Sequence, residues 1–353
     1  MERIYSQFQL EGHVISCTKY GNGHINETYL VVTNQPHLYI LQKLNGYVFP
    51  NLKGLMTIVI AVTEHLRRNA PDLQRVLTLI PAQDGTPYLM EETGECWRMY
   101  DFVLGSVCLE KAESEEDFRQ SGIAFGQFQN LLADFPAETL VETIPHFHDT
   151  PDRYRQLHEA IQEDRAGRLA SVSAEVTAYL AHEEEAATLM NLHRSGKLPL
   201  RVTHNDTKLN NVMLDDVHHQ PLCVIDLDTV MPGLVANDFG DSIRFGASTA
   251  AEDEKDLSKV SMSLALFEAY TEGFLSACGD RLTKLEKETL PMGAKLMTLE
   301  CGARFLADYL NGDVYFRTSR PEHNLDRCRT QLKLVQDMET KWDAMQQVIR
   351  KYC

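Results

Sequence analysis

The sequence predicts an α+β protein with two lobes, a small antiparallel sheet followed by a larger and mainly helical part. Two observations support this. Up to about residue 103, short apolar runs are separated by turn residues, whereas beyond residue 110 apolar residues recur at helical spacing. The chain has 353 residues and is 43% hydrophobic, enough for a sizeable core in each part. We therefore place the lobes at residues 1–103 and 104–353.

The N-terminal part predicts a five-stranded antiparallel sheet with one helix inserted. The helix is expected at residues 52–68, where apolar side chains return every three or four positions. Gly21 and Gly23 form a turn between the first two strand-like runs, where glycine permits a positive φ. The strand-like runs cover residues 13–20, 25–33, 38–42, 76–80, 88–90 and 97–103.

The C-terminal part predicts helices on either side of a β-hairpin. Ser114 precedes three acidic residues and is typical of a helix start. Further helices are expected at residues 152–165 and 174–193 and in the last hundred residues. Between them, two apolar runs at 212–214 and 222–225 are joined by turn residues and predict a hairpin.

Charge and cysteine content exclude several classes of protein. The net charge of −17 argues against a nucleic-acid backbone or an anionic membrane as the main partner. The eight cysteines contain no C-x-x-C pair, which favours reduced thiols over a disulfide framework or a zinc site. The N-terminus lacks an apolar signal core, and no run reaches membrane-spanning length. We expect a cytoplasmic protein that is a monomer or a weak homo-oligomer.

Three polar side chains around the hairpin carry the strongest functional signal. Asp206 lies in the loop before the first strand, Asn211 stands at its start, and Asp226 ends the second strand. A hairpin brings such positions together. Two carboxylates and an amide are suited to a hard cation and to proton transfer.

This pattern resembles the catalytic loop and metal-binding aspartate of kinase-like phosphotransferases, where H-x-D is followed five residues later by Asn. It is most similar to the aminoglycoside phosphotransferase and choline kinase superfamily. Within that superfamily the longer phrases resemble the N-acetylhexosamine 1-kinases: THNDTKLNNVMLD, VIDLDTVMPG and DFGDSIRFG. The Asp-Phe-Gly letters at 238–240 come after the better-spaced metal aspartate, Asp226.

The resemblance implies a two-lobed kinase-like fold with ATP in the cleft and Mg²⁺ as the cofactor. The expected reaction transfers phosphate from ATP to the anomeric hydroxyl of N-acetylglucosamine or N-acetylgalactosamine. Asp206 would accept or orient the hydroxyl proton, Asn211 and Asp226 would bind the metal, and Lys208 would stabilise the transferring group. Asp241 and Arg244, three residues apart, are interpreted as a local ion pair.

The N-terminal lobe should bind the phosphates. Backbone N–H groups around Gly21 and Gly23 can meet phosphate oxygens, and the resemblance places His24 of the same loop at the sugar. Kinase-like folds put a cation on the third strand, held by a carboxylate of the next helix. Here neutral Gln42 takes that position, with Lys43 the alternative if the strand is bulged. Glu64 is the carboxylate of the next helix, and with Gln42 in place of the cation it has no partner of opposite charge at that position.

Two further segments complete the expected site. Met99, Tyr100 and Phe102 stand where the hinge that contacts adenine belongs by chain order. Arg304 and Tyr315 lie in a late segment that is very similar to the hexosamine kinases, in which the matching residues contact the sugar.

Three other functions remain open from the sequence. The first is the same chemistry on another small alcohol, such as another hexose, an aminoglycoside, an amino alcohol or methylthioribose. The second is an inactive nucleotide-binding scaffold, which the neutral Gln42 would favour. The third, a metal-dependent hydrolase, would need a second cluster of ligands that the sequence does not offer.

Overall fold

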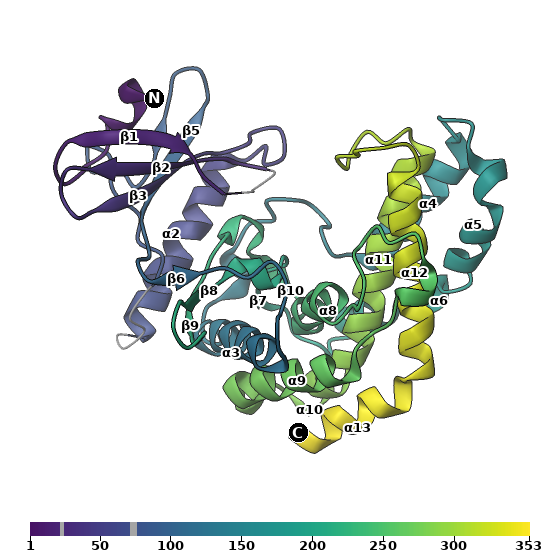
Figure 1. The fold of residues 1–353 in the computed structure, drawn as a ribbon. Coiled ribbons are helices and arrows are strands. Elements are labelled where there is room, and N and C mark those ends of the chain that lie inside the picture. The colour runs from purple at the N-terminus through teal and green to yellow at the C-terminus, as the bar shows by residue number, and fades with distance from the viewer. Residues whose placement is uncertain (22–24, 71–75) are drawn as a thin grey trace.

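The computed structural model describes residues 1–21, 25–70 and 76–353. Gly23 and His24, predicted to contact phosphate and sugar, lie outside these residues. A small antiparallel sheet forms the N-terminal lobe, and a larger, mainly helical lobe follows it, as the sequence predicted (Figure 1). The described residues include no helix that is both long and apolar enough to cross a membrane.

The N-lobe sheet has the strand order β1-β2-β3-β5-β4. Residues 76–80, predicted as a strand, contribute only an isolated bridge between Leu79 and Tyr100, so that prediction was wrong. β4 already pairs with Cys96 and Trp97 along the same edge of β5, so residues 76–80 pair with β5 only at Tyr100. The elements of this lobe are α1 (Glu2–Tyr5), β1 (Val14–Lys19), β2 (Glu27–Thr33), β3 (Leu38–Lys43), α2 (Leu52–Asn69), β4 (Leu89–Met90) and β5 (Cys96–Asp101).

Helix α2 follows the predicted apolar spacing closely. The side chain of Asn51 caps it by accepting a hydrogen bond from the N–H of Gly54 at 3.0 Å. One face, which includes Leu55, Val59 and Val62, is buried in a core shared with the C-terminal lobe. This packing fixes α2 between the sheet and the hairpin.

The C-terminal lobe begins with β6 (Ser106–Val107) and α3 (Glu115–Leu131). Ser114 and Asp117 form a complete capping box at the start of α3, as the acidic first turn predicted. The helix expected at 174–193 is instead three short ones: α5 (Ser173–Leu180), α6 (Glu183–Ala186) and α7 (Thr188–Arg194). Alanine and glutamate favour an unbroken helix here, and it is the burial of Ala186 and Leu189 in the lobe's core that turns the chain.

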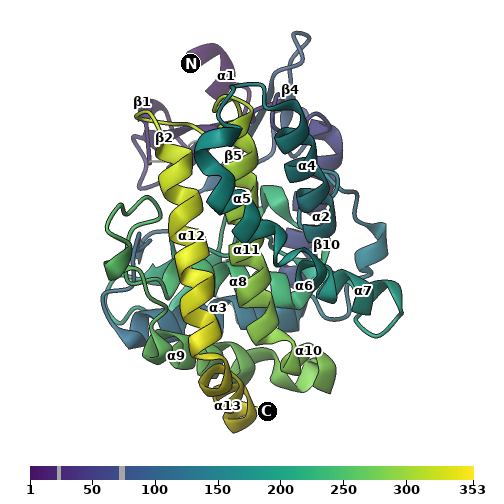
Figure 2. The ribbon, with the colours of Figure 1, turned by 90° about the vertical axis from the view of Figure 1, so that its right-hand side faces the viewer.

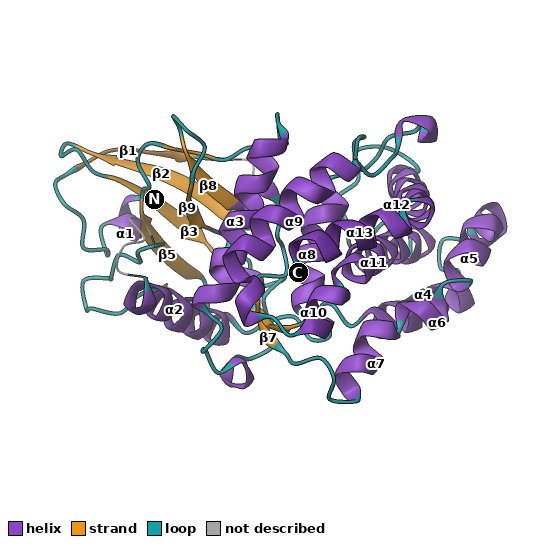
Figure 3. Ribbon diagram, turned by 90° about the horizontal axis from the view of Figure 1, so that it is seen from below, coloured by secondary structure: helices purple, strands orange, loops and turns teal. Residues whose placement is uncertain are grey.

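The hairpin forms where the sequence placed it, and helices surround it. β6, β8 and β9 make a three-stranded sheet, and β7 pairs with β10. Seen from below, the N-lobe strands lie at one end of the molecule together with α1 and α2, and the helices of the C-terminal lobe fill the other end (Figure 3). The remaining elements are α4 (Thr150–Glu163), β7 (Arg201–Thr203), β8 (Val212–Asp215), β9 (Pro221–Val224), β10 (Met231–Gly233), α8 (Val235–Gly246), α9 (Leu264–Cys278), α10 (Lys284–Glu288), α11 (Leu290–Leu310), α12 (His323–Thr340) and α13 (Trp342–Tyr352).

Helix α11 runs through the middle of the helical lobe, with α12 beside it (Figure 2). It approaches α8 very closely at Gly293, where an added Cβ would lie 1.9 Å from the carbonyl oxygen of Ala236. Gly240 on α8 faces the same contact, since a Cβ there would lie 2.3 Å from the carbonyl oxygen of Gly293. Glycine at these positions lets the two backbones meet and so sets the position of α8, which supports the loop between β7 and β8.

Candidate active site

The loop that carries Asp206 is anchored by a buried carboxylate of α8. Asp238 accepts the backbone N–H groups of His204 and Asn205, each at 2.8 Å, and the side-chain amide of Gln129 at 2.8 Å. Burial raises the pKa of Asp238, and the two backbone donors oppose that rise. The Asp-Phe-Gly letters therefore belong to a helix that holds the loop.

His204 joins this loop to the end of the hairpin. Its ring is fully buried, and its Nε2 lies 2.8 Å from the carbonyl oxygen of Ile225. The backbone N–H of Asp206 donates to its Nδ1 at 3.3 Å. A donor is required at Nε2 and an acceptor at Nδ1, so the neutral Nε2-protonated tautomer satisfies both contacts.

Asp206 forms the centre of a small polar group. Its Oδ1 lies 2.7 Å from Lys208 Nζ, and its Oδ2 accepts from Asn211 Nδ2 at 3.1 Å. Burial would raise the pKa of Asp206, but the charge and hydrogen bond of Lys208 outweigh it and the pKa is lowered. Asp206 is therefore an ionised carboxylate with two fixed neighbours.

Asp226 stands two residues after the end of β9, in the left-handed conformation with φ of 58°. The N–H of Ile225 donates to the carbonyl oxygen of Asn211 at 2.9 Å, which brings Asn211 and Asp226 to the same place. Surrounding protein atoms and the charges of Asp228 and Asp206 raise the pKa of Asp226 to about 7. Its surface remains exposed, so water moderates this shift.

The donor set at this position fits a hard divalent cation. Asn211 uses its Nδ2 on Asp206, while its Oδ1 and both carboxylate oxygens of Asp226 accept no hydrogen bond from the part of the chain that the structure describes. Oxygen ligands from one amide and one carboxylate, beside further carboxylates, suit Mg²⁺.

The structure separates the two alternatives for the third strand. Gln42 and Lys43 point to opposite faces of β3. Lys43 pairs with Glu95 and lies 5.7 Å from the centre of the Trp97 ring, on the face away from Asp228, so its assignment to the phosphates is not supported. Gln42 instead accepts a hydrogen bond from Arg98 Nε at 2.9 Å.

Among the residues that the structure describes, no helix glutamate pairs with Gln42 or Lys43. Glu64 of α2 is exposed and makes no ion pair within the described ranges. A buried ion pair joins Arg98 of β5 to Asp228, two residues after Asp226. Sequence reasoning did not identify Arg98; the strand alternation that places it beside Gln42 was its only signal.

Hinge residues Met99 and Tyr100 are buried, and part of their backbone is already paired. The carbonyl oxygen of Met99 accepts from Ile80 N–H at 2.8 Å, and the N–H of Phe102 donates to Leu38 at 3.0 Å. These groups are not available to adenine. A contact of Met99, Tyr100 and Phe102 with ATP through their other atoms stays a prediction.

Arg304 and Tyr315 do come together, on and after α11. The guanidinium carbon of Arg304 lies between 5.4 and 5.7 Å from the ring centres of Phe147, Tyr315 and Phe316. Its Nη2 donates to Tyr315 Oη at 3.4 Å. Tyr315 is 64% exposed, which leaves one side of this aromatic group open.

Asp308 holds the segment that carries Tyr315. It accepts the backbone N–H groups of three successive residues, at 3.0, 2.8 and 3.0 Å, and also the amide of Asn324 at 2.8 Å. The three donors are Val314, Tyr315 and Phe316. The buried carboxylate of Asp308 thus fixes the backbone that carries the exposed ring of Tyr315.

A histidine that the sequence did not single out connects this group to Asp206. His148 lies between Glu300 of α11, at 2.7 Å, and the carbonyl oxygen of Asn205, at 3.0 Å. Glu300 also accepts from Thr150 Oγ1 at 2.8 Å and stands one helical turn before Arg304. Because these residues are more than fifty positions apart in sequence, no local pattern reveals the link.

Asp241 and Arg244 form the predicted ion pair, at 3.0 Å, and both are buried. Asp241 also accepts the N–H of Thr207 at 3.1 Å, and Arg244 reaches Glu252 at 2.9 Å. The pair therefore supports the loop on the side of Lys208.

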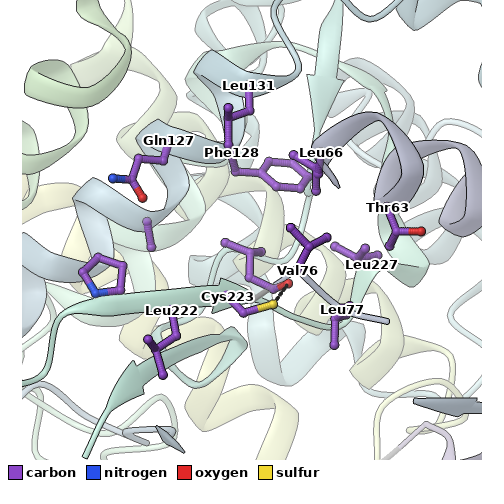
Figure 4. Close-up of a pocket in the computed structure, with 13 residues that line it drawn as sticks. Thr63, Leu66, Val76, Leu77, Gln127, Phe128, Leu131, Leu222, Cys223 and Leu227 are labelled. Atoms are coloured by element: carbon purple, nitrogen blue, oxygen red, sulfur yellow. Dashed lines mark hydrogen bonds between the residues drawn. The ribbon is translucent and has the colours of Figure 1, made fainter. Parts of the chain in front are cut away.

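A separate apolar cavity of about 40 Å³ lies between α2, α3 and β9 (Figure 4). Phe128, Cys223 and Leu227 are among the residues that line it. Burial raises the pKa of the Cys223 thiol to about 12. The cavity is far smaller than a nucleotide site and the thiol is unreactive, so neither contributes to the chemistry of the hairpin.

Comparisons with known proteins agree with this geometry. A family model described as "Phosphotransferase enzyme family" matches residues 16–263. A microcompartment-associated aminopropanol kinase has a TM-score of 0.63 at 17% identity, covering 97% of this chain and 96% of the other. An amicoumacin kinase in complex with AMP-PNP and Ca²⁺ gives 0.60 at 13% identity, with coverage of 96% and 91%.

The choline kinase from Cryptosporidium parvum Iowa II gives a TM-score of 0.57 at 12% identity, with coverage of 96% and 92%. At these identities the structures show a shared fold. The family match covers well over half of the chain and includes the glycine turn, the hinge and the hairpin. The chain therefore belongs to the phosphotransferase enzyme family and has its kinase-like, two-lobed fold.

Proposed function

We propose that this protein is an ATP-dependent kinase that phosphorylates the anomeric hydroxyl of N-acetylglucosamine or N-acetylgalactosamine. The observation that carries the proposal is the group formed by Asp206, Lys208 and Asn211, with Asp226 beside it. It combines an ionised carboxylate, a cation and free oxygen ligands at one position, which is what in-line phosphoryl transfer requires.

Asp206 orients the acceptor hydroxyl. Its lowered pKa makes it a weak base. An anomeric hydroxyl is more acidic than an ordinary alcohol, so holding it in line contributes more than removing its proton. Lys208 compensates the charge of the transferring group from its position 2.7 Å from Asp206.

Asn211 and Asp226 would hold Mg²⁺, which supplies positive charge against the phosphate oxygens when bound. The amicoumacin kinase of the same fold binds AMP-PNP and Ca²⁺, which supports a nucleotide with a divalent cation as the phosphate donor here. Gly21, with φ of +73°, begins the turn that we assign to the phosphates.

Arg304 and Tyr315 support a neutral sugar as the acceptor. A flat guanidinium and an exposed ring offer the donors and the apolar surface that sugars use. Glu300, one helical turn before Arg304, contacts His148, which also contacts the carbonyl oxygen of Asn205 beside Asp206. This chain of contacts supports our assignment of Arg304 and Tyr315 to the same site.

An amino alcohol is the second candidate, because an aminopropanol kinase and a choline kinase share the fold. The charges of this chain argue against it. Arg304 and His148 lie on the acceptor side, and burial, together with the charge of Arg304, lowers the pKa of nearby Arg153. A positively charged amino alcohol would be repelled by these side chains.

A coupled assay of ADP release with Mg-ATP tests the proposal across N-acetylhexosamines, hexoses and amino alcohols. We expect stoichiometric ADP and sugar 1-phosphate with an N-acetylhexosamine, and Asp206→Asn should lower kcat by about 10³-fold or more. Turnover of amino alcohols alone would replace the sugar assignment. Binding of Mg-ATP without turnover of any alcohol would indicate an inactive scaffold.

A further inference from the structure

The face of β3 that carries Gln42 has no cation, since Lys43 lies on the other face, yet a buried cation lies next to Gln42. Arg98 of β5 is the register partner of Gln42 of β3, and its side chain is 1% exposed. Its Nε donates to Gln42 Oε1 at 2.9 Å, and its Nη2 donates to Asp228 Oδ2 at 3.0 Å. Its Nη1 bonds to the other oxygen of Asp228, which completes a two-point ion pair.

Asp228 follows Asp226 in the loop after β9, and among the described residues its carboxylate is bonded by side chains of the N-terminal lobe. It is 2% exposed and stands two residues after Asp226. Besides Arg98, it accepts the side-chain amide of Asn26 at 2.6 Å, and Asn26 in turn accepts the N–H of Asn45 at 3.0 Å. The N-terminal lobe therefore holds the loop that contains Asp226 and Asp228 through the carboxylate of Asp228.

The neutral Gln42 is a requirement of this arrangement. Its Oε1 accepts from Arg98 while its Nε2 donates to Thr28 Oγ1 at 3.1 Å. A lysine or arginine at position 42 would set a second positive charge against the guanidinium in a buried place, which is costly. Gln42, which stands where a cation was expected, accepts a hydrogen bond from a cation on the neighbouring strand, Arg98.

We propose that Arg98 is a positioning residue, which carries on β5 the positive charge that is absent from the Gln42 face of β3 and, through Asp228, fixes Asp226 relative to the nucleotide lobe. Asp226 itself is in the left-handed conformation and contacts no side chain of the described ranges that would hold its carboxylate. Its placement therefore depends on the backbone contacts of Ile225 before it and on the residues that follow it. The inference rests on the proposed use of Mg-ATP but not on the identity of the acceptor.

Binding of Mg-ATP without any acceptor is the decisive measurement, with the melting temperature of the unliganded protein recorded in parallel. Arg98→Gln leaves Asp228 buried and unpaired and is expected to unfold more easily. The double variant Arg98→Gln/Asp228→Asn removes both charges together. We expect it to keep a melting temperature near that of the wild type and to bind Mg-ATP about 10- to 100-fold more weakly by calorimetry, with a similar loss in kcat.

Two more variants separate positioning from bulk stability. Gln42→Arg/Arg98→Gln moves the guanidinium across the strand pair and should recover Mg-ATP affinity to within about tenfold of the wild type. Arg98→Lys keeps the charge but loses the two-point contact and should be intermediate. Arg119→Gln is the matched control, because Arg119 forms an equally two-pointed but more exposed pair with Glu116.

The inference would be overturned if the folded double variant bound Mg-ATP as tightly as the wild type. If the double variant is insoluble, the same result with Arg98→Lys would overturn it. Equal affinities among all folded variants with lowered melting temperatures would assign Arg98 a structural role only. Wild-type protein that binds Mg-ATP but phosphorylates no N-acetylhexosamine would remove the acceptor assignment and leave this inference standing.

Discussion

The imidazole of His148 lies between two oxygen acceptors, 2.7 Å from Glu300 Oε1 through Nδ1 and 3.0 Å from the carbonyl oxygen of Asn205 through Nε2. Neither oxygen can donate, so both contacts are hydrogen bonds only when both ring nitrogens carry a proton and the ring is cationic. Burial opposes this charge, but Glu300 outweighs burial and the pKa of His148 is raised above its ordinary value of 6.5. One charged ring thus joins α11 to the catalytic loop.

His148→Gln should lower stability by about 1–3 kcal/mol, because the glutamine can replace only part of the contact. The folded pKa of His148 lies above the unfolded one, so its contribution is complete below pH 6.5 and is lost as the pH rises through the folded pKa. Denaturation curves of both proteins, recorded from about pH 5 to about pH 9 so that they span histidine titration, measure this difference. His218→Gln, at a largely exposed position, is the control. A difference independent of pH would contradict the cationic ring.

Arg304→Gln should raise KM for the sugar about tenfold and leave KM for ATP unchanged. The substitution removes the planar cation that lies among three aromatic rings, while the phosphate side of the site stays intact. Steady-state kinetics with each substrate varied in turn provide the measurement. Arg165→Gln, an exposed pair with Glu163, serves as control. An equal rise in both KM values would point to a general disturbance of the lobe.

Asp238→Asn should destabilise the protein by about 2–4 kcal/mol and lower kcat, because an amide must then turn one donor toward the donors of His204, Asn205 and Gln129. Chemical denaturation and hydrogen exchange at the loop check the two effects. Exchange that accelerates everywhere equally, and not first at residues 204–206, would mean that Asp238 stabilises the lobe in general.

Gly293→Ala should destabilise the protein by about 1–3 kcal/mol or more, because the new methyl would overlap the carbonyl oxygen of Ala236 and force α8 away from α11. Thermal denaturation gives the effect, and kcat should fall with it since α8 carries Asp238. Gly279→Ala is a matched control, because its new Cβ would meet nothing closer than 3.8 Å. Similar stability in both variants would show that the helices can separate at no cost.

Short-range features of the fold were predictable because they are encoded within single segments. The capping box at Ser114, the apolar face of α2 and the hairpin all depend on residues a few positions apart. Where packing of distant parts overrides local preference, prediction failed. The unbroken helix over 174–193 and the strand over 76–80 are both of this kind.

The sequence by itself determined the group at the hairpin. Asp206, Asn211 and Asp226 flank two short strands, and pairing of these strands brings the three side chains close together. Only the tertiary structure decided where the buried cation lies and what connects the acceptor side to the catalytic loop. Arg98 reaches Asp228 across 130 positions, and His148 reaches Glu300 across 152. Such pairs form because folding buries both partners together, and the local sequence around one charged residue does not indicate which distant charge it will pair with.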